Sequence, residues 1–148
     1  MKLLAPLILV SLAFAPSAYA RVCAVTVDST DQMTFTQKQI KVAGDCTQVK
    51  LTLRHTGKLA ATAMGHNWVL TKTADYQPVA MAGMRMKLAD AYVPKNDARV
   101  LAHTAVIGGG QSTSVTFSTV KLVKGGDYTF FCSFPGHFAM MKGKFVFG

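Results

Sequence analysis

Acidic side chains are scarce in this chain of 148 residues. Seven Asp and Glu side chains stand against 16 Lys and Arg, which gives a net charge of +9 at pH 7. A positive charge of this size can indicate binding to nucleic acid or to an anionic surface. The basic residues are scattered, however, and the sequence contains no basic helix and no interleaving of aromatic with basic residues. We therefore predict no nucleic-acid binding and interpret the charge as favouring solubility and an acidic partner.

Long hydrophobic runs are lacking except at the N-terminus. Lys2 precedes an apolar stretch from Leu3 to Phe14, and Ala18-Tyr19-Ala20 has the small-x-small pattern of a cleavage site. This order predicts a cleaved secretory signal peptide over residues 1–20 and a single mature domain over residues 21–148. The loss of Lys2 would leave a net charge of +8. We therefore expect a periplasmic protein.

No later stretch is long enough to cross a bilayer as a helix. A lipid anchor would require a lipidated Cys23 preceded by a run of small residues. The residues before it, Tyr19-Ala20-Arg21-Val22, do not form such a run. We therefore expect a protein without a membrane anchor.

Cysteine is also scarce, and its count is odd. Three cysteines in an exported protein leave at least one of them without a disulfide partner. Cys23 and Cys46 can close a loop of 24 residues, which would leave Cys132 as the unpaired cysteine. A bound metal ion would explain how a free thiol stays reduced where oxidation is favoured.

The prominent pattern in the rest of the chain is the period-two alternation of β-strands. The clearest case is Cys46–His55, where Val49, Leu51 and Leu53 alternate with polar and basic residues. Similar short runs recur between turns, which predicts antiparallel sheets with one polar face. Residues 74–93 break this pattern, because their apolar residues recur at helical spacing. The sequence thus predicts an all-β protein, an eight-stranded β-sandwich with one short inserted helix.

A set of soft donor groups lies between Cys132 and Met141. Their spacing is Cys-x4-His-x3-Met, and Pro135-Gly136 is typical of a turn that can direct His137 back toward Cys132. Each residue alone has a more common structural explanation, since a buried cysteine is a small hydrophobe and methionine fills cores. Together they suit copper, which accepts thiolate, imidazole and thioether ligands at one site.

A fourth ligand must come from His55, His66 or His103. His55 has the parity of the buried side chains in its strand, which is more typical of a hydrogen-bonded core residue. His103 is more typical of a surface or half-buried histidine. His66 points inward at the start of a strand and follows Gly65, which allows the backbone to approach a metal closely. The trigonal set with a weak axial thioether that is typical of blue copper sites is then His66, Cys132, His137 and Met141.

Two longer motifs carry a family resemblance. The stretches Met64–Leu70 and Phe130–His137 resemble the copper-site motifs of the azurins, a branch of the cupredoxins. Asp31-Gln32-Met33 and Met140-Met141-Lys142-Gly143 also match. The resemblance extends from about Cys23 to the C-terminus, essentially the whole predicted mature chain.

The resemblance implies a fold, a cofactor and an activity. The fold is a Greek-key sandwich with a Cys23–Cys46 disulfide. The cofactor is one type 1 copper ion, with the Gly65 carbonyl on the axial side opposite the methionine, and with hydrogen bonds near Asn67 and Phe134 that tune its potential. The activity is the transfer of single electrons by a monomer between redox proteins, such as c-type cytochromes or a copper or haem reductase. The implied copper ligands are His66, Cys132 and His137 in the plane and Met141 on the axis.

The resemblance also implies an apolar patch around His137, through which electrons would enter and leave. The family positions of this docking patch are Met33, Leu59, Met64, Met84, Phe134, Pro135 and Ala139. Two departures from the family pattern bear on the choice of partner. The loop at residues 58–63 lacks an expected proline, and Met84-Arg85-Met86-Lys87 places cations beside the patch.

A copper carrier that hands its metal on is the main alternative. Such a protein needs exposed and exchangeable ligands, whereas this chain predicts one enclosed site. An enzyme is also less consistent with the sequence, because a Cys–His nucleophile pair needs an open cleft and an orienting third group. A copper oxidase or reductase would need further histidine clusters, and the chain has four histidines in all. We therefore predict an electron carrier that is not an enzyme.

Overall fold

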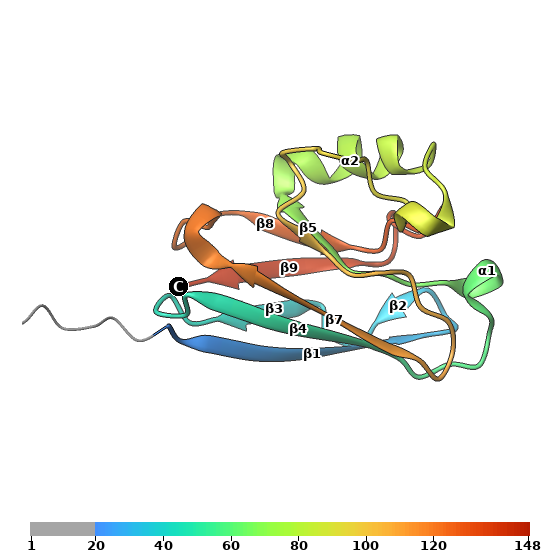
Figure 1. Cartoon of the computed structure of the whole chain (residues 1–148), viewed down its shortest axis with the longest axis horizontal. Helices are drawn as coiled ribbons and strands as arrows, with labels where there is room; N and C mark the ends of the chain where they lie inside the picture. The colour runs from blue at the N-terminus through green and yellow to red at the C-terminus, as the bar shows by residue number, and fades with distance from the viewer. Residues whose placement is uncertain (1–19) are drawn as a thin grey trace, which may run out of the picture.

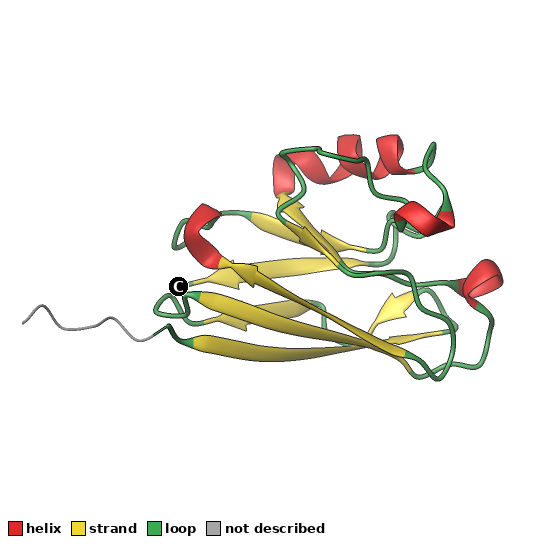
Figure 2. Cartoon of the chain, in the orientation of Figure 1, coloured by secondary structure: helices red, strands yellow, loops and turns green. Residues whose placement is uncertain are grey.

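Two β-sheets face each other and form the layers of a sandwich (Figures 1 and 2). The structure is a computed structural model that describes residues 20–148. The predicted signal peptide therefore lies outside the described residues, apart from Ala20. Within the described part of the chain, no helix is long and apolar enough to span a membrane.

The first sheet contains four strands in the order β2-β1-β4-β7. They are β1 (Val22–Thr30), β2 (Thr34–Phe35), β4 (Gln48–His55) and β7 (Ser112–Ser118). β1 and β4 run parallel along their whole length, and the other two pairs are antiparallel. The Cys23–Cys46 disulfide that the family resemblance implies is present, and it joins the start of β1 to the turn before β4.

The second sheet contains five strands in the order β3-β9-β8-β5-β6. They are β3 (Gln39–Val42), β5 (Val69–Lys72), β6 (Ala102–His103), β8 (Tyr128–Phe131) and β9 (Lys142–Phe147). β3 and β9 are parallel, whereas β8 pairs antiparallel with both β5 and β9. The loop between β8 and β9 leaves the sheet at one end of the sandwich and carries Cys132, His137 and Met141.

The alternation in the sequence places the core between the two sheets. In β4 the side chains of Val49, Leu51 and Leu53 are fully buried, and each such burial contributes roughly 1.5–3 kcal/mol relative to exposure. Trp68 is also fully buried and stacks on Phe117 of the first sheet, with ring centroids 5.9 Å apart. Because it bridges the two layers, Trp68 anchors the chain two residues after His66.

The predicted all-β sandwich is confirmed, with two differences in its strands. Nine strands form in the described residues, because Thr34–Phe35 and Gln39–Val42 pair in different sheets and count as two. The prediction of purely antiparallel sheets is wrong for two pairs, β1–β4 and β3–β9. These strands are not neighbours in the sequence, so a crossover between the sheets brings them together in parallel.

The predicted helical segment forms a shorter helix than its periodicity indicates. Helix α2 (Tyr76–Gly83) follows the 3₁₀ turn η1 (Thr73–Asp75), and a second 3₁₀ turn, η2 (Leu88–Asp90), comes after it. Its buried side chains pack on the outer face of the second sheet, against Val69 and Phe131.

Two further short turns border the ends of the sandwich. A single-turn helix, α1 (Ala61–Met64), lies where the sequence predicts a loop. It is at the end of the molecule opposite the 3₁₀ turn η3 (Thr119–Lys121), as Figures 1 and 2 show. The loop that carries Cys132 and His137 reaches toward the α1 end.

Candidate metal centre

The loop between β8 and β9 is closed by backbone hydrogen bonds that bring its two ends together. Cys132 N–H donates to the Met141 carbonyl at 3.0 Å, and Met141 N–H donates to the His137 carbonyl at 2.8 Å. The turn in between requires Gly136, whose φ of +84° lies in the left-handed region. This local fold places a thiol, an imidazole and a thioether on one short loop.

His66 reaches the same place from the segment before β5, the strand that pairs with β8. Its backbone pairs with Ile107, with His66 N–H donating at 3.0 Å and Ile107 N–H donating back at 2.8 Å. Gly65 precedes it at a tight approach, where a Cβ atom would lie 2.3 Å from the Ala61 carbonyl oxygen. Only glycine therefore allows α1 to pack closely beside His66.

Three ligand atoms converge in the buried centre. Cys132 Sγ lies 3.8 Å from His66 Nδ1 and 3.7 Å from His137 Nδ1. All three atoms lie within 4.8 Å of one another. Cys132, His66 and Met141 are fully buried, and His137 retains 4% of its exposure. A thiol, two imidazoles and a buried thioether form a donor set that fits copper.

The surrounding groups fix which nitrogen of His66 is free. His66 Nε2 lies 2.9 Å from the Thr30 carbonyl oxygen. Because a carbonyl only accepts, Nε2 carries the proton and Nδ1 keeps its lone pair toward Cys132. The sequence did not reveal this contact, since it comes from a backbone carbonyl that any residue could supply.

Burial controls the protonation of the donors. Burial raises the pKa of the Cys132 thiol from 9.0 to about 12, although backbone N–H groups of Asn67 and Phe134 donate to the sulfur and oppose this rise. Burial also lowers the pKa of His66 from 6.5 to about 4 and lowers that of His137. Both imidazoles are therefore neutral at pH 7, and a metal must displace a single proton, that of the thiol.

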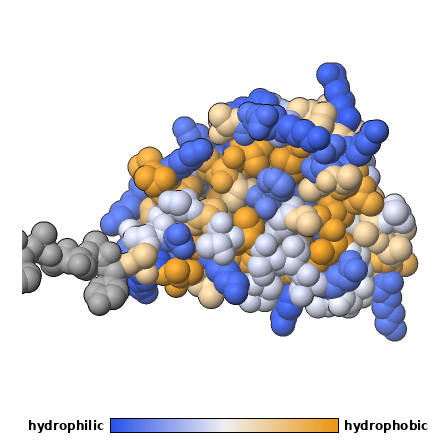
Figure 3. Space-filling model, in the orientation of Figure 1, coloured by the Kyte–Doolittle hydropathy of each residue, from blue (hydrophilic) through white to orange (hydrophobic). Residues whose placement is uncertain are grey.

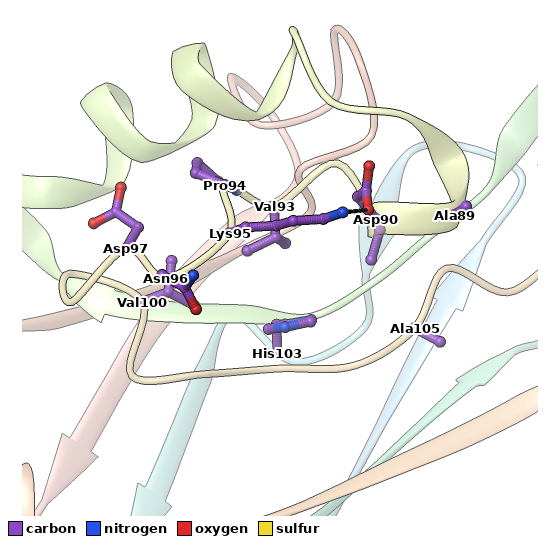
Figure 4. Close-up of a pocket in the computed structure, with 11 residues that line it drawn as sticks. Ala89, Asp90, Val93, Pro94, Lys95, Asn96, Asp97, Val100, His103 and Ala105 are labelled. Atoms are coloured by element: carbon purple, nitrogen blue, oxygen red, sulfur yellow. Dashed lines mark ion pairs between the residues drawn. The ribbon is translucent and has the colours of Figure 1, made fainter.

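The two other candidate histidines do not join this centre. His55 is buried and stacks on His66 with ring centroids 4.5 Å apart. Its two ring nitrogens lie 3.0 Å from the Met64 carbonyl oxygen and 3.0 Å from Gly57 N–H, so it is a satisfied core residue. His103 is exposed and lines a separate pocket between Asp90 and Ala105 (Figure 4).

The residues of the predicted docking patch differ in exposure. Leu59, Met84, Pro135 and Ala139 are exposed, whereas Met33, Met64 and Phe134 are partly buried. Phe134 packs on His137 at a tilt, with ring centroids 4.6 Å apart. Met140, which the sequence analysis placed in a family motif but not in the patch, is 70% exposed on the same loop. Its position directly after Ala139, a residue of the predicted patch, was the signal in the sequence.

Comparisons with known proteins agree with this donor set. A family model described as copper binding proteins, plastocyanin/azurin family, matches residues 21–148. The azurin of Bordetella pertussis is 55% identical over 131 residues, which cover 88% of this chain and 87% of that protein. Azurin-1 of Alcaligenes xylosoxydans xylosoxydans is 55% identical over 121 residues, covering 82% of this chain and 94% of its own.

A solved structure also shares the fold. An azurin (Az-iso2) from Methylomonas sp. strain J superposes with a TM-score of 0.82 at 43% sequence identity, covering 85% of this chain and 98% of that one. When bound, copper cycles between Cu(II) and Cu(I) and thus supplies one-electron chemistry. His66, Cys132, His137 and Met141 form the copper site of a blue copper electron carrier. The chain therefore belongs to the plastocyanin/azurin family of copper binding proteins.

Proposed function

We propose that the protein works in the periplasm, where it carries single electrons between redox proteins that dock over His137. The partners are redox proteins such as c-type cytochromes and a copper or haem reductase, and the carrier is a monomer. One observation carries this proposal: His137 is the only one of the four donors with any exposure, at 4%. The electron therefore has its shortest route to the surface through the His137 ring.

The proposed docking patch combines Phe134 with other apolar side chains that the family resemblance places around this ring. Phe134 packs on His137, and Leu59 and Met84 are 44% and 41% exposed. Exposed apolar side chains around a nearly buried imidazole favour close contact with a partner while water is displaced. Such contact shortens the distance from His137 to the partner's cofactor.

The Gly65 carbonyl oxygen, 3.9 Å from Cys132 Sγ, is a further candidate axial ligand.

Cations border the docking patch. Lys58 is exposed beside Leu59, and Arg85 and Lys87 are exposed beside Met84. Their charge would steer an acidic partner toward the patch and raise the association rate more than the affinity. An electron carrier needs brief encounters, so we expect a small interface, below about 1,200 Å².

The burial of the metal centre also argues against an enzyme and against a copper carrier. Cys132 and His137 lie 3.7 Å apart, as a nucleophile and base would, but Cys132 is fully buried and no substrate carbon can reach its sulfur. The same burial would slow the release of copper, whereas a metal carrier needs exchangeable ligands. If copper moved to a chelator faster than electrons moved to a redox protein, the copper carrier would be favoured.

A charge placed in the docking patch tests the site of electron transfer. Met64→Glu should slow electron transfer to a redox protein, because an anion would remain desolvated between the two surfaces. Val120→Glu is the matched control, since Val120 is 84% exposed in η3 at the far end of the molecule. Stopped-flow measurements should find slow transfer for Met64→Glu alone, with unchanged copper spectra for both variants. Equal rates in both variants would place the docking surface elsewhere.

Ionic strength tests the role of the cations. Raising it from about 0.01 M to 0.15 M shortens the Debye length from roughly 30 to 8 Å. Transfer to an acidic redox protein should then slow, and transfer to a basic one should accelerate. Rates that are independent of salt for both partners would exclude electrostatic steering.

A further inference from the structure

The backbone at Ala91-Tyr92 has an unusual conformation. Their φ angles are 54° and 52°, so two consecutive residues other than glycine lie in the left-handed region. Residues other than glycine rarely adopt this backbone conformation, and it persists only where the surrounding structure holds it. The contacts of these two residues therefore indicate what the segment supports.

The Ala91 carbonyl is a buried acceptor that joins two segments of the copper site. It accepts from Asn67 Nδ2 at 2.8 Å and from Ser133 Oγ at 3.0 Å. Asn67 and Ser133 also hydrogen-bond each other directly, because Ser133 N–H donates to Asn67 Oδ1 at 2.8 Å. Asn67 follows His66 and Ser133 follows Cys132, so this carbonyl holds together the residues next to two copper ligands.

Tyr92 supports the other side of the same loop. Its ring packs edge-to-face on Phe134, with centroids 5.3 Å apart and planes at 75°. Behind it, the Tyr92 carbonyl lies against helix α2, where a Cβ atom on Gly83 would approach its oxygen to 2.2 Å. Tyr92 therefore lies between Phe134 and the end of α2.

The two contacts converge on one sulfur atom. The backbone N–H groups that donate to Cys132 Sγ belong to Asn67 and Phe134. Ala91 holds the first of these residues, and Tyr92 packs on the second. We propose that Ala91-Tyr92 is a positioning element that fixes both N–H donors against the Cys132 thiolate and so helps to set the reduction potential.

This inference rests on the assignment of Cys132 as a copper ligand. That assignment also determines whether the N–H donors raise or lower the reduction potential. N–H dipoles directed at the sulfur stabilise negative charge there. The reduced centre carries one more electron than the oxidised centre, so these donors favour reduction. Loosening them should lower the reduction potential.

Removal of the Tyr92 ring tests the proposal. In the copper-loaded protein, Tyr92→Ala should lower the ratio of reduced to oxidised protein about threefold at a fixed solution potential, equivalent to a fall of about 28 mV. Tyr92→Phe keeps the ring and should keep the parent potential. If Tyr92→Ala does not fold, Tyr92→Leu tests the same loss of the edge-to-face contact.

A matched control separates positioning from general loosening. Phe117 is a partly buried ring in the core between the sheets, where its aromatic contacts are with Trp68 and Phe145. Phe117→Ala should lower the thermal unfolding temperature but leave the potential unchanged. An equal fall in potential for Phe117→Ala and Tyr92→Ala would overturn the proposal.

Amide resonances give an independent measurement. In the diamagnetic reduced protein, the N–H signals of Asn67 and Phe134 should shift and exchange faster in Tyr92→Ala than in the parent. A variant with an unchanged or raised potential and unaltered amide signals would overturn the positioning role. A parent protein that never becomes blue with copper would instead contradict the copper site itself.

Discussion

At the scale of single residues, burial and backbone contacts prepare the donors before a metal arrives. Burial keeps the His66 imidazole neutral, and the Thr30 carbonyl, 2.9 Å away, keeps its proton on Nε2. Nδ1 is therefore free to bind, and no proton must leave this ring first. The Cys132 thiol differs, because burial raises its pKa to about 12 and a soft metal is needed to displace the proton.

The lowered pKa of His66 predicts acid sensitivity of the copper-free protein. The native pKa of about 4 lies below the ordinary 6.5, mainly because of burial. Between these values the unfolded chain binds more protons, so the free energy of unfolding should fall as the pH falls through this window. Urea midpoints of the copper-free protein from pH 7 to 4 would measure the effect. A midpoint that stays constant over this range would contradict it.

Met141 offers a test of the axial ligand. Its thioether is a weak donor to the oxidised site, so Met141→Leu should keep the blue colour and raise the reduction potential. The leucine fills a similar volume in a fully buried position, which limits the loss of packing. Spectroelectrochemistry measures both properties. Loss of the blue band, or a lower potential, would exclude a weak axial role for Met141.

At the scale of elements, the disulfide ties together the two central strands of the first sheet. Cys23 lies in β1 and Cys46 precedes β4, and the bond closes a loop far from the copper site. The chain-entropy model assigns roughly 3 kcal/mol to a loop of this length. The double variant Cys23→Ala/Cys46→Ala should lose about this much stability in denaturant titrations. An altered copper spectrum in this variant would show an unexpected coupling of the two sites.

The strands illustrate which features of the fold the sequence could and could not predict. The burial of Val49, Leu51 and Leu53 follows from period-two alternation. Inward parity, the position at the start of a strand and the preceding glycine together selected His66, which the structure places beside Cys132 and His137. Parallel pairing of β1 with β4 could not be predicted, because alternation reports which face is buried and not which strand is adjacent.

Some parts of the site also left no trace in the sequence. The Thr30 carbonyl at His66 and the Ala91 carbonyl at Asn67 are backbone groups, so no side chain marks them. The single-turn helix α1 was missed because four residues are too few to show helical periodicity. These contacts depend on how distant segments pack, which local patterns do not reveal.

At the scale of the whole molecule, the copper site lies at one end, whereas the basic residues are scattered along the chain. The copper loop and α1 lie at the same end of the sandwich (Figure 1). Hydrophilic side chains project all around the visible face in Figure 3, with apolar areas between them. In the proposed docking, a net charge of +9 from 16 basic and 7 acidic side chains would act on a partner mainly from a distance, and apolar contact at the copper end would determine the final position.

The central claim is that His66, Cys132, His137 and Met141 bind one copper ion as a blue centre. Titration of the copper-free protein with Cu(II), followed by visible absorption, tests it most directly. An intense thiolate-to-copper band should grow until one equivalent is added, stay in His55→Ala and His103→Ala, and disappear in Cys132→Ser. A parent protein that stays colourless, or a Cys132→Ser variant that is equally blue, would contradict the assignment.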